Sequence, residues 1–181
     1  SLVQSVPYIF AGLAVALGFR LGLFNIGAEG QIGVGWMVSV IVGFVLGEGF
    51  FGDFQGLPAV LHLPLSILAG AMAAGVWAAI AGLLKAETGA HEVITTIMLN
   101  YISFRLSEWL LCGPLEHVQG TCRTREIAAS AYLPKFLDHP VTMHWGFVLA
   151  LAAAAATAWF LFQTNWGFAL RTVCASSDAA W

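Results

Sequence analysis

The sequence predicts an all-α fold, a polytopic transmembrane bundle of about five spanning helices, one of them broken near Gly27–Gly30. Composition carries this prediction, because 59% of the 181 residues are hydrophobic and only 9% are charged, whereas soluble domains have roughly 25% charged residues. The mean hydropathy of +0.83 agrees, since a soluble domain of 19.3 kDa could not cover its surface with so few charges. The net charge of -3 argues against a nucleic-acid partner, which requires a basic face.

Five stretches of the sequence are apolar enough to form the spans, since a spanning helix takes about 20 such residues. The second is the shortest, and we expect a half helix there if its first turn begins inside the membrane. Basic residues are divided evenly between the two sides, so the positive-inside rule leaves the orientation open. The predicted spans are residues 2–23, 31–46, 58–84, 92–112 and 145–163.

Polar residues interrupt the apolar sequence between the first two spans, at residues 24–31. A carboxylate at membrane depth is strongly disfavoured unless it meets water or a partner. Gly27, Gly30 and Gly33 would also interrupt a helix, and irregular backbone at this depth is tolerated only beside protein or a wet cavity. We therefore interpret the stretch as the lining of a transport pathway for a polar solute, with the side chains of Asn25, Glu29 and Gln31.

The fourth predicted span carries a row of polar residues. Spacings of 4, 4, 3 and 4 residues place them within a narrow arc of an α-helix: Glu92, Thr96, Asn100, Ser103 and Ser107. Such a row either binds helices together by hydrogen bonds or lines a wet pathway. We favour the pathway for Thr96, Asn100 and Ser103, because the amide of Asn100 can both donate to and accept from a ligand.

The third predicted span carries a ridge of small residues at every fourth position, Gly70, Ala74, Ala78 and Gly82. Small residues at this spacing let helix backbones approach closely in lipid. We predict a helix–helix contact along this ridge, and favour a static contact over a moving interface within a transporter.

Spacing suggests two further side-chain pairs. Arg105 and Glu108 lie three residues apart and are predicted to form a local ion pair. Cys112 and Cys122 could form a disulfide if they share an oxidising side, and the sequence leaves this open.

The sequence contains no motif for catalysis or metal binding. His91-Glu92 does not begin a zinc-protease motif, because Thr95 stands where the second histidine is required. A Walker A sequence and a Gly-x-Ser-x-Gly elbow are also missing. We therefore predict no catalytic residue, no metal and no cofactor bound by this chain, and ATP, if used, binds to another subunit. The scattered histidines are expected at the surface: His62, His117, His139 and His144.

Three motifs carry a resemblance to a known family. The first is Asn-Ile-Gly-Ala-Glu-Gly-Gln at 25–31. The second is Leu-Lys at 84–85, followed by Glu-Val-Ile-Thr-Thr-Ile-Met-Leu-Asn-Tyr at 92–101. The third is Gly-Phe-Ala-Leu-Arg at 167–171, with Ala-Ala at 179–180. Together they resemble the permease subunits of bacterial ATP-binding-cassette (ABC) importers for nucleosides and simple sugars, within a wider set that also moves ribose-type sugars and branched-chain amino acids.

The resemblance implies an assembly. Residues 1–181 would be one transmembrane permease domain, a fragment of a longer chain in the bacterial cytoplasmic membrane. Its partners would be a second permease subunit, a cytoplasmic ABC ATPase dimer that binds ATP, and an extracytoplasmic substrate-binding protein. Residues 113–144 would form an extracytoplasmic loop, and residues 164–181 a cytoplasmic segment that couples to the ATPase. The coupling residues would be Arg171, Ser177, Asp178, Ala179 and Ala180.

We therefore expect the permease subunit of an ATP-driven importer of nucleosides or simple sugars. Two alternatives stay open. One is a secondary transporter or channel for a small polar solute, which would not depend on an ATPase, and the other is an ABC permease for branched-chain amino acids. The sequence does not name the solute or say whether two permease subunits are identical.

Overall fold

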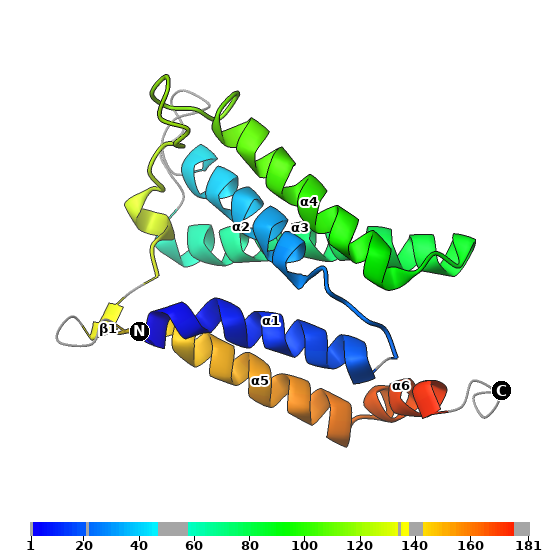
Figure 1. Cartoon of the computed structure of the whole chain (residues 1–181). Coiled ribbons are helices and arrows are strands. Elements are labelled where there is room, and N and C mark those ends of the chain that lie inside the picture. The colour runs from blue at the N-terminus through cyan, green and yellow to red at the C-terminus, as the bar shows by residue number, and fades with distance from the viewer. Residues whose placement is uncertain (1, 21, 47–57, 134, 138–142, 176–181) are drawn as a thin grey trace. The chain divides into compact units, whose positions relative to one another are not determined.

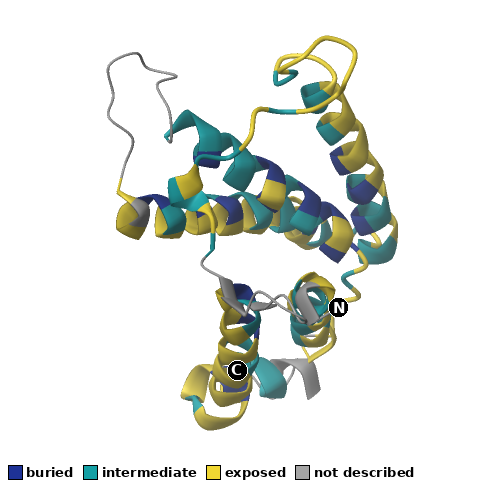
Figure 2. Cartoon of the chain, turned by 90° about the vertical axis from the view of Figure 1, so that its left-hand side faces the viewer, coloured by how far each residue is buried: buried dark blue, intermediate teal, exposed yellow. Residues whose placement is uncertain are grey.

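The computed structural model describes residues 2–20, 22–46, 58–133, 135–137 and 143–175, and helices dominate these residues (Figure 1). The chain divides into two compact units, one formed by Ser1–Ala28 with Leu133–Trp181 and the other by Glu29–Tyr132. Exposed residues run along the helices of both units (Figure 2), and many are large and apolar, such as Val60 and Met72. Exposed apolar surface on this scale is typical of helices that face lipid or further protein. The predicted all-α fold is confirmed.

The unit of the two chain ends contains three helices: α1 (Leu2–Arg20), α5 (Trp145–Gln163) and α6 (Asn165–Ala175). Helix α1 packs mainly against α5. The guanidinium groups of Arg20 and Arg171 lie 5.6 and 5.3 Å from the ring centroid of Phe162, within the range of a cation–π interaction. One aromatic ring of α5 therefore contacts the last residue of α1 and the middle of α6.

A short antiparallel hairpin precedes α5 and adds to the predicted helices. Strand β1 (Lys135–Leu137) pairs with β2 (Met143–His144), with Lys135 opposite His144. His144 also caps α5, because its Nδ1 accepts a 3.2 Å hydrogen bond from the Gly146 N–H. The hairpin lies within the predicted loop of residues 113–144.

The second unit contains three helices and one 3₁₀ turn: α2 (Ala28–Val45), α3 (Ala59–Thr88), α4 (Glu92–Leu111) and η1 (Ala129–Ala131). An ion pair between Lys85 and Glu92, with an N–O distance of 2.5 Å, bridges the turn from α3 to α4. The turn η1 packs against α3. Figure 1 shows α2, α3 and α4 side by side in this unit.

The five predicted spans correspond to α1, α2, α3, α4 and α5, within a few residues at their ends. Among the described residues, three helices are long and apolar enough to cross a membrane: Ala28–Val45, Val60–Thr88 and Trp145–Gln163. The predicted interruption lies just before α2, which begins at Ala28, so Gly30 already belongs to the helix. That residues 1–181 form a single permease domain stays a prediction.

The histidine on α3 is not at the surface, so the prediction for His62 is wrong. Its side chain is fully buried, with Nδ1 2.7 Å from Ser130 Oγ and Nε2 3.4 Å from the Val42 carbonyl oxygen. Ser66, one turn further along α3, is buried on the same face and donates to the His62 carbonyl oxygen. Polar partners on α2 and η1 therefore explain the burial of the imidazole.

Helices α2 and α3 approach each other closely at Gly35 and Gly70. A Cβ atom added at Gly70 would overlap Ser39 Oγ and lie 2.7 Å from the Gly35 carbonyl oxygen. The Ser39 hydroxyl is held in place, because it donates a 2.9 Å hydrogen bond to the Ser66 carbonyl oxygen. Glycine is therefore required at position 70 by the space that α2 leaves.

The predicted ridge on α3 meets α2 at its first two positions. A Cβ atom added at Gly35 would lie 3.0 Å from the Gly70 carbonyl oxygen and 3.2 Å from Ala74 Cβ. Ala78 is half-buried, and a Cβ atom at Gly82 would meet nothing within 4 Å in the described part of the chain. A packing role for the far end of the ridge stays a prediction.

Replacing Gly70 with alanine is expected to destabilise the full-length permease by about 1–3 kcal/mol, because the added methyl group overpacks the α2–α3 contact. Gly75→Ala is the matched control on the same helix, since a Cβ atom there meets nothing within 4 Å. Alanine at that position should be neutral or stabilising by about 0.5–1 kcal/mol. Thermal unfolding of the detergent-solubilised protein measures both, and equal melting temperatures for the two variants would contradict a tight crossing.

Candidate solute pathway

The first turn of α2 is bound by two side chains of α4. The Gly30 N–H donates a 2.9 Å hydrogen bond to Asn100 Oδ1, and the Ser103 hydroxyl donates a 3.0 Å hydrogen bond to the Gly30 carbonyl oxygen. The contact leaves no room for a side chain, because a Cβ atom at Gly30 would lie 2.6 Å from Asn100 Oδ1 and 2.9 Å from Asn100 Cα. The glycine backbone and the polar pair on α4 thus fit each other directly.

This contact sets where α2 begins relative to α4. Asn100 and Ser103 lie roughly 12–17 Å from the first residue of α4, at about 1.5 Å per residue, which is near the middle of this 20-residue helix. The far ends of both helices adjoin the same segment. Phe44 of α2 lines one hollow with eight residues between His117 and Ala128, and Cys112, just after α4, is bonded to Cys122. The first turn of α2 therefore lies beside the middle of α4. Because α2 has 18 residues and is long enough to cross a membrane, a half helix here stays a prediction.

The polar row of α4 lies on the buried side of the helix. Thr96, Asn100 and Ser103 are buried, and Thr96 Oγ1 donates a 2.7 Å hydrogen bond to the Glu92 carbonyl oxygen. Glu92 itself is paired with Lys85. Within this unit, hydrogen bonding between helices accounts for Ser103 and for the carbonyl of Asn100. A further role of these residues in a solute pathway stays a prediction.

A hollow of about 580 Å³ opens between α2 and α4, next to the Gly30 contact. It brings together two polar residues singled out in the sequence, the exposed Glu29 and the half-buried Ser107. Apolar walls make up most of the rest. The complete lining is Glu29, Ile32, Gly33, Trp36, Phe104, Ser107, Glu108, Leu111, Cys112 and Cys122.

Sequence reasoning missed the two aromatic residues of this hollow. Trp36 lies seven residues after Glu29 and Phe104 three residues before Ser107, so each shares a helix face with its polar neighbour. That spacing was available in the sequence. The sequence does not show which face of α2 meets which face of α4, because this contact depends on Gly30 and Asn100, which are 70 residues apart.

Five of the six predicted pathway residues lie outside the lining of the hollow: Asn25, Gln31, Thr96, Asn100 and Ser103. Asn25 belongs to the connection before α2, where its Oδ1 accepts a 2.9 Å hydrogen bond from the Gly27 N–H. Gln31 is half-buried on α2 and, like Thr96, is not among the described residues that line the hollow. Their place in a pathway is therefore not determined by this hollow and stays a prediction.

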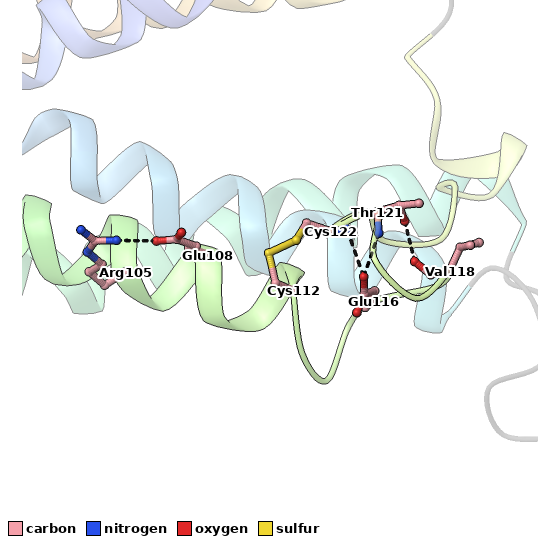
Figure 3. The surroundings of a disulfide bond; sticks show 7 residues. All are labelled: Arg105, Glu108, Cys112, Glu116, Val118, Thr121 and Cys122. Carbon is pink, nitrogen blue, oxygen red and sulfur yellow. Dashed lines mark hydrogen bonds and ion pairs between the residues drawn. A yellow bond between two sulfur atoms is a disulfide. The ribbon is translucent and has the colours of Figure 1, made fainter.

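A disulfide between Cys112 and Cys122 closes the segment that follows α4 (Figure 3). Glu116 braces the closed loop, because its Oε1 accepts hydrogen bonds of 3.0 and 3.1 Å from the N–H groups of Thr121 and Cys122. This pairing settles what the sequence left open. The predicted ion pair is confirmed in the same region, with Arg105 Nη1 2.7 Å from Glu108 Oε2.

The predicted coupling segment is described in part. Arg171 lies on α6, where its Nε donates a 3.2 Å hydrogen bond to the Gly167 carbonyl oxygen. The other predicted coupling residues, Ser177, Asp178, Ala179 and Ala180, lie outside the described residues. A coupling role for any of these residues stays a prediction.

The chemistry offered by the hollow is hydrogen bonding and apolar contact. Glu29 provides a carboxylate, Ser107 a hydroxyl, and Trp36 and Phe104 flat apolar faces. Among the described residues, no group of three or more His, Cys, Asp or Glu could hold a metal ion. The arrangement is suited to holding a small solute.

Asn100→Ala is expected to destabilise the full-length protein by about 1–3 kcal/mol, because the buried Gly30 N–H loses its acceptor. Asn165→Ala is the matched control, since Asn165 is exposed at the start of α6 and its loss should change stability by no more than about 0.5 kcal/mol. Melting temperatures in detergent compare the two variants. A similar small change for both would show that Asn100 does not hold the start of α2.

Reduction or removal of the disulfide is expected to lower stability by about 2–3 kcal/mol in the chain-entropy model, given its sequence separation of 10 residues. A membrane-impermeant maleimide tests both the bond and its side of the membrane, in a background where every other cysteine of the full-length protein, Cys174 included, is replaced with alanine. Labelling of intact cells should appear only after reduction. Labelling without reductant would contradict the disulfide, and labelling only in permeabilised cells would contradict an extracytoplasmic position.

Comparison with known proteins supplies the family. The model of the family described as "Branched-chain amino acid transport system / permease component" matches residues 1–181. No solved structure matches the chain.

Three curated relatives illustrate the similarity. The guanosine ABC transporter permease protein NupP of Bacillus subtilis is 42% identical over 94% of this chain and 47% of its own length. The glucose ABC transporter permease protein TsgB13 of Haloferax volcanii is 34% identical over 99% of this chain and 47% of its own length. The nucleoside ABC transporter permease protein NupB of Lactococcus lactis is 31% identical over 96% of this chain and 48% of its own length. The chain therefore spans about half the length of the curated relatives it matches, and it belongs to the branched-chain amino acid transport system permease family.

Proposed function

We propose that the full protein is the transmembrane permease subunit of an ATP-driven ABC importer that moves nucleosides or simple sugars across the bacterial cytoplasmic membrane. The observation that carries this proposal is the family match over residues 1–181. Relatives named for guanosine, glucose and nucleoside transport are 42%, 34% and 31% identical to the chain. Their names support a solute rich in hydroxyl groups.

The chemistry of the α2–α4 hollow supports a neutral solute. Its described lining includes the carboxylates of Glu29 and Glu108 and contains no basic side chain. An amino acid would bring its own carboxylate, which needs a cationic partner when it leaves water. Sugar and nucleoside hydroxyls can instead donate hydrogen bonds to a carboxylate. A carboxylate could also bind the ammonium group of an amino acid, so the preference for nucleosides and sugars over branched-chain amino acids rests on the named relatives.

In the proposed assembly, the chain pairs with a second permease subunit above a cytoplasmic ABC ATPase dimer. An extracytoplasmic substrate-binding protein delivers the solute, and ATP binds to the ATPase. The Cys112–Cys122 disulfide supports an extracytoplasmic position for the loop of residues 113–144, because disulfides persist in oxidising compartments. Residues 164–181, with Arg171 on α6, would then face the ATPase.

Transport in this proposal is an exchange between outward-open and inward-open states. ATP binding closes the ATPase dimer, and the coupling segment passes that motion to the permease helices. Each state must bind solute or partners differently for ATP to shift the populations. The solute passes between permease subunits and meets the exposed Glu29. Asn25, Gln31 and Thr96 stay predicted members of the pathway, whereas Asn100 and Ser103 hold the start of α2.

The experiment that tests this function is reconstitution of the full-length permease in liposomes with its second permease, its ATPase and its binding protein. We expect uptake of radiolabelled guanosine or glucose only when ATP is present on the side of the membrane where the ATPase is bound. An ATPase variant that binds but does not hydrolyse ATP should abolish multiple-turnover uptake. Uptake that does not depend on ATP would instead support a secondary transporter or channel.

A further inference from the structure

The α2–α4 hollow combines a carboxylate with aromatic faces, and this combination points to one class of solute if the proposed transport function holds. Glu29 is exposed on the first turn of α2, beside the middle of α4. An ionised side chain within a membrane cannot face hydrocarbon without a large free-energy penalty. We therefore expect water, a polar solute or a protein partner beside Glu29, which lines the hollow.

A carboxylate selects for hydrogen-bond donors. An ionised Glu29 can only accept hydrogen bonds, through two oxygen atoms. Two neighbouring hydroxyl groups, such as those of ribose, can donate to both oxygens at once. Ser107, half-buried in the same lining, adds a hydroxyl group that can donate or accept. Charge-assisted hydrogen bonds of this kind are stronger than those between neutral groups.

The aromatic residues add flat apolar surface within the same lining. Trp36 and Phe104 are 45% and 44% exposed, so parts of both rings remain open to a ligand. Stacking of a nucleobase on an aromatic side chain contributes substantially to binding. The volume of about 580 Å³ lies within the usual range of small-molecule sites, about 300–1,000 Å³.

We propose that this hollow is a nucleoside-binding site, in which Glu29 accepts hydrogen bonds from the ribose hydroxyls and Trp36 and Phe104 contact the base. This proposal depends on the proposed import function and adds the residues that would recognise the solute. Nucleotides are expected to bind more weakly than nucleosides, because the carboxylate of Glu29 would repel a phosphate group. Glu108 is held by Arg105 at 2.7 Å, which leaves Glu29 as the carboxylate for the solute.

Photolabelling with 8-azidoguanosine tests the site directly, with the complete transporter in nanodiscs and without its binding protein. Labelled peptides are expected from α2 and α4, around Trp36 and Phe104. Guanosine should compete about tenfold better than 2′,3′-dideoxyguanosine, which lacks the ribose diol, and better than guanosine monophosphate.

Variants assign the roles. Glu29→Gln should reduce labelling and remove the preference for guanosine over its dideoxy analogue. Trp36→Leu should reduce labelling about tenfold, whereas Trp36→Phe should retain it because a flat face remains. Trp109→Leu is the matched control, since Trp109 is an exposed tryptophan of α4 outside the hollow. Monodisperse elution in detergent shows that each variant is folded.

The possible outcomes separate the site from the transport function. Guanosine uptake with no labelling of α2 or α4, or equal competition by the dideoxy analogue, would overturn the site and leave the importer standing. Labelling that depends on Glu29 and Trp36, without ATP-dependent uptake of guanosine, would support the site and overturn nucleoside import. Equal loss in Trp36→Leu and Trp109→Leu would also overturn the site.

Discussion

The hydrogen bonds that α4 makes to Gly30 constrain the rest of the second unit. The first N–H groups of any helix have no partner within the helix, and in a membrane core no water is available to satisfy them. Asn100 provides an acceptor for the Gly30 N–H, and Ser103 provides a donor for its carbonyl oxygen. Helix α2 can therefore begin beside the middle of α4 with the N–H and the carbonyl group of Gly30 both hydrogen-bonded.

The same contact places the chemistry of the hollow. Because Gly30 lies flat against α4, the neighbouring Glu29 is directed away from the contact and is exposed. The next turns of α2 bring Gly33 and Trp36 past α4 and complete the lining. The buried polar pair on α4 therefore holds the start of α2, and the exposed carboxylate of Glu29 lines the hollow beside this contact.

Much of the fold could be predicted from local sequence because hydrophobic runs of spanning length specify helices directly. The short hairpin of β1 and β2 could not, since it consists of few residues within a long polar connection. The burial of His62 could not either. Its environment is formed by Ser130, 68 residues away, and by the backbone of α2.

The polar residues of the candidate site could be predicted from the sequence, but the contact between α2 and α4 that brings them together could not. Glu29 and the row on α4 are conspicuous because they are polar within apolar sequence. Whether Asn100 binds a solute or a neighbouring helix depends on a partner 70 residues away, which no local pattern reveals. The disulfide was undecided for a similar reason, since it requires Cys112 and Cys122 to lie on the same side of the membrane.

The buried imidazole of His62 has a consequence for the segment that follows α4. Through Ser130 it ties η1 to α3, and the Ala128 N–H reaches the Gly43 carbonyl oxygen near the end of α2 at 3.4 Å. The disulfide joins the other end of the same segment to α4. The segment between α4 and η1 is therefore held by α2, α3 and α4 together, so displacing it would disturb contacts with all three helices at once.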